Sequence, residues 1–394
     1  MRQPVGPASA DRFGLAPPYG SGTLAELMPA VLRSLDAGAD LPRAAAVDGL
    51  ALVPNPKACV LLVDGLGDVL LRERAGHAPY LRGRLDGAAS LDVGFPTTTA
   101  TSMGSFGTGL PPGAHGLVGY EVLVPERDVL LNELSWETPV DPRTWQPRPT
   151  VFERAVAAGV EVVRIGPGFF DGSGLTEAAL RGGRFVAANS LEARVDAALA
   201  ALRSAARVLV YVYWGDLDKV GHVHGCGSWE WGEELAAVDL GVRRLAAGLP
   251  RDATLYVTAD HGMVDVPHSQ RLDVGLEPDL AAGVRHVGGE PRAPQLYCEP
   301  GAAESVARAW AERLGARADV LTREQAIAGG WFGPVAPHVR DRIGDIVVSC
   351  GTDLAVVDSR HHRPELLALV GLHGARTPAE WRVPLLTVGG AGRG

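Results

Sequence analysis

Four hydrophobic segments that lie far apart in the chain each end in residues able to bind a metal ion. The segments are VLLVDGLG (60–67), VYVYWGDLDKVGH (210–222), TLYVTADHG (254–262) and LLALVGLHG (366–374). A short apolar run that ends in a polar loop residue is typical of a buried parallel strand, whose carboxyl end faces the active site in α/β proteins. Together the segment ends supply a carboxylate and imidazole set large enough for two divalent cations: Asp64, Asp218, His222, Asp260, His261 and His373.

The order of strand and helix patterns predicts an α/β fold, with a mainly parallel central sheet covered by helices on both faces. Strands are expected at 57–63, 90–95, 160–166, 183–188, 207–214 and 253–260. Helices are expected at 23–38, 150–159, 191–206 and 229–248. Thr23 and Glu26 form a capping-box pattern at the start of the first helix.

Two regions depart from this alternation. Residues 1–22 are rich in Pro and Gly and are interpreted as an extended N-terminal arm, which leaves one large domain at 23–394. Within it, residues 285–345 are interpreted as a small inserted α+β subdomain that borders the mouth of the site. Its aromatic pair, Trp331 and Phe332, is expected to shape substrate choice.

Charge and composition restrict the partners. A formal net charge of −9 over 394 residues argues against a nucleic-acid-binding surface, which is normally basic. No apolar run approaches the roughly 18 residues that a membrane span needs, and the first residues lack a secretory pattern, so we expect a cytoplasmic protein without membrane contact. The oligomeric state stays open.

The cysteines have no C-x-x-C spacing and are expected to be buried free thiols: Cys59, Cys226, Cys298 and Cys350.

Between the first two segments lies FPTTTATSMGSFGTG (95–109), a hydroxyl-rich turn that leads into an expected helix. A threonine at a helix start beside a metal site indicates phosphoryl transfer through a covalent intermediate. Each motif is weak by itself, because Asp64 also fits a turn and the Asp218 and His222 spacing is common by chance. Their joint occurrence at strand ends favours an enzyme over the remote alternative, a non-catalytic protein that metal ions stabilise.

The motifs occur in one order along roughly residues 57–390: Asp64, Pro96–Thr99, Thr108–Gly116, Asp218–His222, Asp260–Gly262 and Gly371–Gly374. This set resembles the alkaline phosphatase superfamily, in its type I phosphodiesterase/nucleotide pyrophosphatase branch. That branch has its nucleophilic threonine in a P-T-x-T segment. The spacing from Thr99 to Thr108–Gly109 matches that pattern, so the resemblance assigns the nucleophile to Thr99 and not to its neighbouring threonines.

The resemblance implies an alkaline-phosphatase-like three-layer sandwich that binds two divalent metal ions. One ion would be bound by Asp218, His222 and His373. The other would be bound by Asp64, Asp260, His261 and the Thr99 oxygen. Zinc fits this ligand set best, with manganese or iron as alternatives.

The implied activity is hydrolysis of phosphodiester or pyrophosphate bonds in a small-molecule substrate, through a phosphothreonine intermediate on Thr99. The alternative is a phosphomonoesterase or phosphonate hydrolase of the same superfamily. A sulfatase is excluded, because the C-x-P-x-R pattern of that group is missing.

Two departures from the resembled family concern the substrate. Tyr120 occupies the position of an asparagine that helps bind the phosphoryl group, and its hydroxyl can still donate a hydrogen bond. Ala100 follows Thr99 where those enzymes have a phenylalanine, so a surface for stacking a nucleobase is missing there. Another apolar wall could come from aromatic residues that are otherwise expected in the core: Phe169, Phe170 and Trp214.

Overall fold

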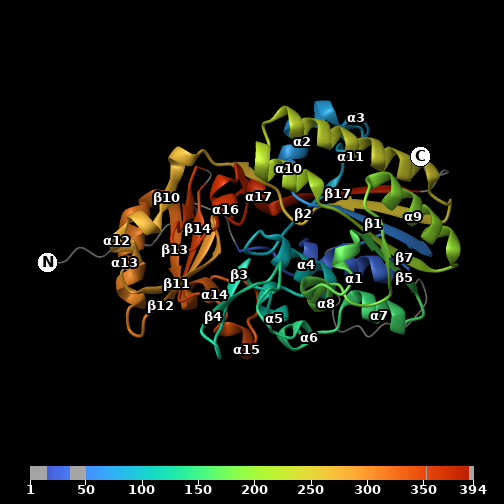
Figure 1. Cartoon of the computed structure of the whole chain (residues 1–394). Coiled ribbons are helices and arrows are strands. Elements are labelled where there is room, and N and C mark those ends of the chain that lie inside the picture. Colours follow the sequence, from blue (N-terminus) through green and yellow to red (C-terminus); the bar gives the residue numbers. More distant parts are fainter. Residues whose placement is uncertain (1–15, 36–49, 352, 390–394) are drawn as a thin grey trace.

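The computed structural model describes residues 16–35, 50–351 and 353–389. Its central feature is a seven-stranded sheet in the order β2-β17-β8-β1-β7-β5-β6 (Figure 1). All its strands run parallel except β17, which is antiparallel to both of its neighbours. The strands are β1 (Lys57–Val63), β2 (Ala89–Asp92), β5 (Glu161–Gly166), β6 (Arg184–Ala187), β7 (Val208–Trp214), β8 (Ala253–Thr258) and β17 (Arg382–Gly389).

The central strands form because their residues are apolar throughout and β-branched at many positions. Residues 58–63 of β1 are all buried, and so is every residue of β8. Burial on both faces is the environment that a continuous apolar run requires. The expected strand at 90–95 is shifted, since β2 ends at Asp92 and pairs with β17.

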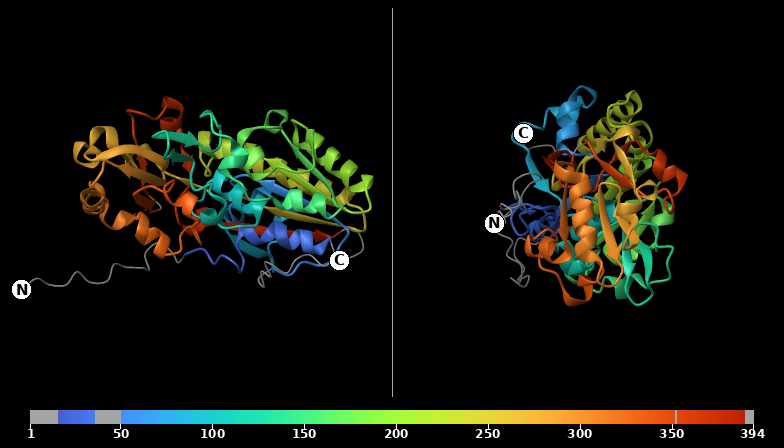
Figure 2. Two further views of the ribbon diagram at one scale, coloured as in Figure 1. Left: turned by 90° about the horizontal axis from the view of Figure 1, so that it is seen from below. Right: turned by 90° about the vertical axis from the view of Figure 1, so that its left-hand side faces the viewer.

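Helices cover both faces of the sheet and complete three layers (Figures 1 and 2). One face carries α1 (Leu24–Ser34), α4 (Thr99–Thr108), α7 (Val151–Ala157) and α8 (Gly174–Ala179). The other carries α2 (Asp68–Glu73), α9 (Leu191–Ser204), α10 (Asp216–His224) and α11 (Trp229–Gly248). The predicted fold class, an α/β sandwich with a mainly parallel sheet, is confirmed.

A smaller lobe lies at the left of Figure 1. Its four-stranded antiparallel sheet has the order β11 (Val284–Glu290), β12 (Ala293–Cys298), β14 (Ile346–Cys350) and β13 (Ala318–Thr322). Helix α13 (Ala303–Leu314) covers this sheet, and Trp310 lies at the centre of a separate hydrophobic core. The predicted insertion at 285–345 contains three of these strands, and β14 follows it directly. Arg292 joins the lobe to the main body through a buried ion pair with Glu380, at 2.6 Å.

Short elements connect these parts. The strands are β3 (Glu121–Val124), β4 (Val129–Asn132), β9 (Val264–Asp265), β10 (Arg271–Asp273), β15 (Ala355–Val357) and β16 (Gly371–Leu372). The α-helices are α3 (Pro79–Arg82), α5 (Pro112–His115), α6 (Pro142–Trp145), α12 (Pro278–Ala281), α14 (Arg323–Ala328), α15 (Pro337–Arg340), α16 (Pro364–Ala368) and α17 (Pro378–Trp381). The 3₁₀-helices are η1 (Ala75–His77), η2 (Gly168–Phe170), η3 (His268–Gln270), η4 (Val274–Leu276) and η5 (Gly315–Arg317).

Most of the predicted N-terminal arm, residues 1–15, lies outside the described residues. Of the part that is described, Tyr19 donates a hydrogen bond of 2.8 Å to the carbonyl of Trp331. Trp331 and Phe332 are themselves buried and stack edge-on against Phe95. Their expected role at the mouth of the site is therefore wrong, because both rings are part of the core. The four cysteines are free and buried, as predicted.

Candidate active site

The predicted metal ligands come together at one edge of the central sheet. Strands β1, β7 and β8 are adjacent and parallel, so the residues that follow them meet at their carboxyl ends. Asp64 follows β1, Asp218 and His222 lie on α10 after β7, and the pair Asp260 and His261 follows β8. His373 follows the short strand β16, which pairs with β9 beside them.

Each of the three histidines uses Nδ1 to contact a backbone carbonyl. The distances are 2.7 Å from His222 to Gly371, 2.8 Å from His373 to Thr97 and 3.1 Å from His261 to Gly262. A histidine that donates from Nδ1 has its Nε2 lone pair free, and such contacts orient metal-binding histidines. The three Nε2 atoms are therefore available as ligands.

Carboxylate oxygens lie opposite these nitrogens. His222 Nε2 is 3.2 Å from Asp218, and His261 Nε2 is 3.3 Å from Asp64 and 3.5 Å from Asp260. One oxygen of each of these three carboxylates is buried without a hydrogen-bond partner. Two groups of three residues have ligand atoms within 4.8 Å of one another: Asp218, His222 and His373, and Asp64, Asp218 and His261. The residues thus fit a pair of divalent cations.

The electrostatics of the cluster also favour bound cations. Burial and the carboxylates of Asp260 and Asp218 raise the pKa of Asp64 well above its usual range. Burial likewise raises the pKa of Asp260. Burial also acts to raise the pKa of Asp218, but His222 and His373 outweigh it and hold that pKa below its usual range. Crowded, buried carboxylates of this kind are stabilised when a cation lies between them.

Thr99 is the first residue of α4, and Thr98 precedes it as the N-cap. Its Oγ1 lies 3.2 Å from Nε2 of His261. The segment is fixed to the metal-ligand loops, because the Thr97 amide donates to Gly374 and the Ser102 hydroxyl donates to the Asp260 carbonyl. The hydroxyl of Thr99 is therefore held beside the carboxylate and imidazole cluster at the amino end of a ten-residue helix.

Two features of the cluster were not foreseen from the sequence. Tyr213 is the second-to-last residue of β7, and its hydroxyl donates a hydrogen bond to Asp64. Gly65 adopts a left-handed conformation with φ of 73°, and a Cβ there would lie 3.0 Å from the side chain of Asp218. The alternation of side chains along β7 predicts that Tyr213 and Tyr211 share one face of the sheet. It does not predict the contact of Tyr213 with Asp64, which depends on the tertiary structure.

The cluster opens into a cavity of about 710 Å³. Thr99, Asp218 and His373 form its polar end, and Tyr120 and Lys219 also belong to its lining. The other end is mainly apolar, and its lining includes Phe169, Phe170, Leu175, Leu180, Phe185 and Tyr211. The predicted apolar wall is thus present in part, because Trp214 is buried against Arg194 and does not line the cavity.

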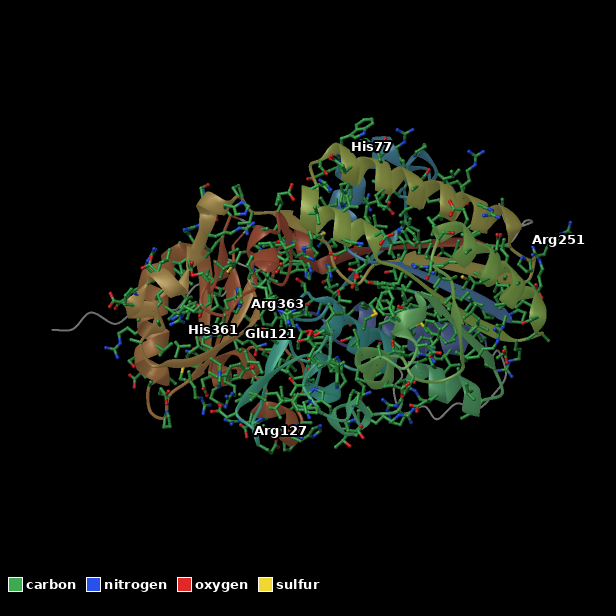
Figure 3. The ribbon with its side chains drawn as sticks, in the orientation of Figure 1. His77, Glu121, Arg127, Arg251, His361 and Arg363 are labelled. Carbon is green, nitrogen blue, oxygen red and sulfur yellow. The ribbon has the colours of Figure 1, made fainter. Side chains whose placement is uncertain are left out.

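The smaller lobe also reaches the cavity. Glu290 and Pro291, at the turn between β11 and β12, belong to its lining. Burial raises the pKa of Glu290 to about 8. A second, more polar cavity of about 600 Å³ shares Tyr120 with the first. Its lining includes Glu121, His361 and Arg363, which lie between the two lobes in Figure 3.

His115 is a structural residue, as its position in a turn motif suggested. It is fully buried, with Nε2 at 3.1 Å from the Ser105 hydroxyl and Nδ1 accepting from the Leu117 amide. Burial lowers its pKa to about 3. Its ring packs against Gly104 of α4, where a Cβ would lie 2.4 Å away. His115 therefore supports the helix that begins at Thr99.

Comparison with known proteins identifies the class. Residues 58–376 match the type I phosphodiesterase/nucleotide pyrophosphatase family. Because this match covers most of the chain, the protein belongs to that family and is a hydrolase of phosphoric ester bonds. The family is metal-dependent, in agreement with the cluster described above. No curated protein matches the sequence significantly.

Solved structures with the same fold have low sequence identity. Murine ectonucleotide pyrophosphatase/phosphodiesterase 5 has a TM-score of 0.67 at 18% identity, over 84% of this chain and 88% of the murine chain. Phosphonoacetate hydrolase from Sinorhizobium meliloti 1021, solved with phosphonoacetate, has a TM-score of 0.66 at 20% identity, over 86% and 91% of the two chains. These similarities establish the alkaline-phosphatase-like fold. Among the described helices, none is both long and apolar enough to cross a bilayer.

Proposed function

We propose that the protein hydrolyses phosphodiester or pyrophosphate bonds of small molecules, with Thr99 as the nucleophile and two divalent cations in the cluster. The observation that carries this proposal is the position of the Thr99 hydroxyl. It lies at the amino end of α4, 3.2 Å from Nε2 of His261, next to three carboxylates with unpartnered buried oxygens.

The ligand division implied by the motifs fits this geometry. Asp218, His222 and His373 form one compact group and would bind the first ion. The second ion would be bound by Asp64, Asp260, His261 and Thr99. The imidazole of His261 lies 3.5 Å from Asp260 and 3.2 Å from the Thr99 hydroxyl. The mixed carboxylate and imidazole set favours zinc, and manganese and iron are the alternatives. Bound cations would lower the pKa of an adjacent hydroxyl or water and stabilise negative charge on phosphoryl oxygens.

The reaction then proceeds in two displacements. The Thr99 oxygen gives up its proton and forms a bond to phosphorus while the bond to the leaving oxygen breaks, and the leaving group departs with its electron pair and takes up a proton. The intermediate is a phosphothreonine that keeps the second ester group of a diester substrate. Water attacks the phosphorus in the second step, and the Thr99 oxygen leaves and regains its proton.

Groups of the protein are positioned for the phosphoryl oxygens. The first amides of α4 have no partner within the helix, and they are available to bind an anion at its amino end. Tyr120 lines the same cavity, and burial raises its pKa, which keeps its hydroxyl protonated as a donor. Phosphonate hydrolysis is the second candidate, since the S. meliloti phosphonoacetate hydrolase shares the fold.

The experiment compares turnover of bis(p-nitrophenyl) phosphate and p-nitrophenyl phosphate by zinc-loaded protein, with elemental analysis of the same samples. We expect close to two zinc ions per chain and faster turnover of the diester. A single tightly bound ion, with no gain in activity from added metal, would contradict the two-metal site. Faster turnover of the monoester would favour a phosphomonoesterase of the same superfamily.

Thr99→Ala tests the nucleophile. We expect kcat to fall by roughly 10⁴-fold or more, the scale seen when a nucleophile is removed, with zinc content close to that of the wild type. Thr101→Ala is the matched control, because Thr101 is buried two residues further along the same helix. Normal turnover by Thr99→Ala would exclude the covalent route.

A further inference from the structure

Arg164 is a buried cation in the wall of the active-site cavity. It lies on β5, only 6% of its surface is exposed, and it belongs to the cavity lining. Its Nε and Nη1 atoms are buried without a hydrogen-bond partner. A guanidinium stays charged at neutral pH, and a buried charge with unsatisfied donors is strongly unfavourable. An anion within hydrogen-bond distance would remove this penalty.

The strands beside Arg164 supply aromatic neighbours and no carboxylate. In the sheet register Arg164 is paired with Phe185 on β6 and with Tyr211 on β7. Directly paired residues point to the same face, and all three line the cavity. The guanidinium carbon lies 5.6 Å from the ring centre of Phe185, and the Tyr211 hydroxyl contacts Met103. The charge is thus enclosed by apolar groups.

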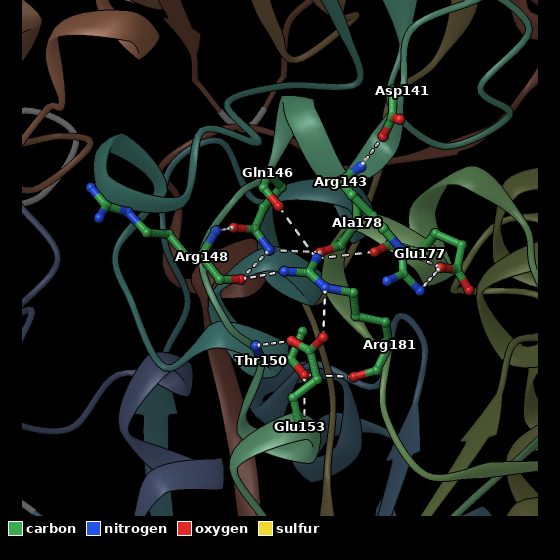
Figure 4. A network of polar contacts seen from close by, with 9 residues as sticks. All are labelled: Asp141, Arg143, Gln146, Arg148, Thr150, Glu153, Glu177, Ala178 and Arg181. Carbon is green, nitrogen blue, oxygen red and sulfur yellow. Dashed lines mark hydrogen bonds and ion pairs between the residues drawn. The ribbon is translucent and has the colours of Figure 1, made fainter. Parts of the chain in front are cut away.

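The acidic residues nearby are exposed or have other partners. Asp171 is exposed. Glu177 accepts two hydrogen bonds from Arg143, at 2.7 Å and 3.0 Å (Figure 4). In the same network Glu153 pairs with Arg181, which also donates to the carbonyl groups of Glu177 in α8 and of Arg148. The network ties α8, which forms part of the apolar end, to α6 and to the loop before α7, and Arg164 is not part of it.

Arg164 lies where it could contact the part of a substrate that is remote from the reacting phosphoryl group. Tyr213 lies two residues after Tyr211 on β7, a step of about 7 Å along a strand, and it contacts Asp64 at the reaction centre. Arg164 and Thr99 line one cavity, and Arg164 is paired in the sheet with Tyr211, one such step before the residue that contacts Asp64. Of the described residues that line the apolar end, Arg164 is the one with a positive charge.

We propose that Arg164 binds a carboxylate on the organic portion of the substrate. This inference rests on the proposed function and deepens it: the substrate class is a phosphoric diester whose apolar or aromatic portion carries a carboxylate. A guanidinium binds a carboxylate through two parallel hydrogen bonds, and its single charge balances a single negative charge. A doubly charged phosphate would need a second cation at this end of the cavity.

Binding tests the inference without turnover. Isothermal titration calorimetry of the zinc-loaded protein would compare 3-phenylpropanoate with 3-phenylpropanamide. We expect the wild type to bind the carboxylate at least about tenfold more tightly, the scale of a hydrogen bond to a charged group, and Arg164→Gln to lose this preference. Arg154→Gln is the control, because Arg154 donates to the Thr108 carbonyl and does not line the cavity.

A preference that survives in Arg164→Gln would overturn the proposal, since the carboxylate would then be bound by zinc or elsewhere. Equal binding of the acid and the amide by the wild type would overturn it as well. Circular dichroism would establish that Arg164→Gln is folded. If it is not, Arg164→Lys retains the charge without the paired donors, and it must show a weaker preference than the wild type for the proposal to stand.

Turnover separates this inference from the proposed function. The substrates are p-nitrophenyl 4-carboxybenzyl phosphate and its carboxamide. We expect the wild type to favour the carboxylate by about tenfold in kcat/KM, and Arg164→Gln to turn over the two at nearly equal rates. Failure to hydrolyse either diester would contradict the proposed function, while the calorimetric result would still decide the role of Arg164.

Discussion

The two ends of the active-site cavity are built in different ways. At the polar end, every candidate ligand follows a strand or belongs to the helix after one, and backbone carbonyls orient all three imidazoles. At the apolar end, the wall comes from the short helix η2, from α8 and from the edge strand β6, and Phe169 is 76% exposed. The first arrangement fixes the geometry of a reaction. The second can vary in shape without disturbing that geometry.

This contrast predicts where changes are tolerated. A substitution at the polar end removes a charge from a buried cluster, so it affects metal binding and rate together. A substitution at the apolar end changes only the contacts with the organic part of a substrate. The predictions below are given from the largest expected effect to the smallest.

The largest effect is expected for Asp218→Asn. Asp218 would bind the first ion, and its carboxylate also lies within 4.8 Å of ligand atoms of Asp64 and His261, which would bind the second. We expect the bound zinc to fall well below two ions and kcat to fall by roughly 10³-fold or more, since the cations contribute several kcal/mol to transition-state stabilisation. The control is Asp216→Asn, an exposed residue of the same helix. Unchanged zinc content in Asp218→Asn would show that the cluster is not the metal site.

Tyr213→Phe should have an intermediate effect. The Tyr213 hydroxyl donates to Asp64, and removal of a group that orients a metal ligand typically weakens metal affinity by about 10- to 100-fold. Competition with a zinc chelator measures this change. Tyr211→Phe is the matched control two residues away, because the Tyr211 hydroxyl donates to the sulfur of Met103 and not to a candidate metal ligand. Equal zinc affinity in the two variants would mean that Tyr213 does not position Asp64.

The stability of the fold is expected to depend on pH through Glu133, in the loop beside Tyr120. Glu133 is fully buried, accepts a hydrogen bond from Trp145, and donates its amide to the Tyr120 carbonyl. Burial raises the pKa of Glu133 from 4.5 to about 8. The folded state therefore binds this proton more tightly than the unfolded state, and the stabilisation present below pH 4.5 is lost as the pH rises toward 8.

Denaturant unfolding of wild type and Glu133→Gln measures this loss. The wild type should lose up to about 1.4 kcal/mol of stability per pH unit relative to the variant across that range, the limit for one proton. A difference in unfolding free energy that does not change between pH 5 and pH 8 would show that Glu133 keeps an ordinary pKa.

The smallest effect is expected at the apolar end. Phe169→Ala removes an exposed ring that stacks edge-on against Phe170. We expect kcat/KM for an aromatic diester to fall by about tenfold or less, the scale of one aromatic contact, and kcat and zinc content to stay close to the wild type. Steady-state kinetics with an aryl and an alkyl diester check this. A fall in kcat equal for both substrates would mean that the ring supports the reaction centre.

The sequence predicts the polar end better than the apolar end, and the reason is physical. The ligands follow apolar runs such as residues 57–63, whose burial fixes them as adjacent parallel strands, and parallel strands bring their carboxyl ends together. The strand positions and the capping box at Thr23 and Glu26 follow from equally local patterns.

The apolar end depends on contacts that no local pattern encodes. Phe170 and Trp214 both lie close to a strand end, yet one lines the cavity and the other packs against Arg194. Trp331 and Phe332 are expected from the sequence to shape substrate choice, but they are buried against Phe95, more than two hundred residues earlier in the chain. The cross-strand pairing of Arg164 with Tyr211 is likewise a property of the sheet register.

The covalent intermediate on Thr99 is the central claim, and it can be observed directly. Zinc-loaded protein would be mixed with excess bis(p-nitrophenyl) phosphate, quenched in acid during turnover, digested, and mapped by mass spectrometry. The account predicts an aryl-phosphorylated peptide modified at Thr99, absent from Thr99→Ala treated in the same way. Turnover without any modified Thr99 peptide, or with the modification on another residue, would contradict it.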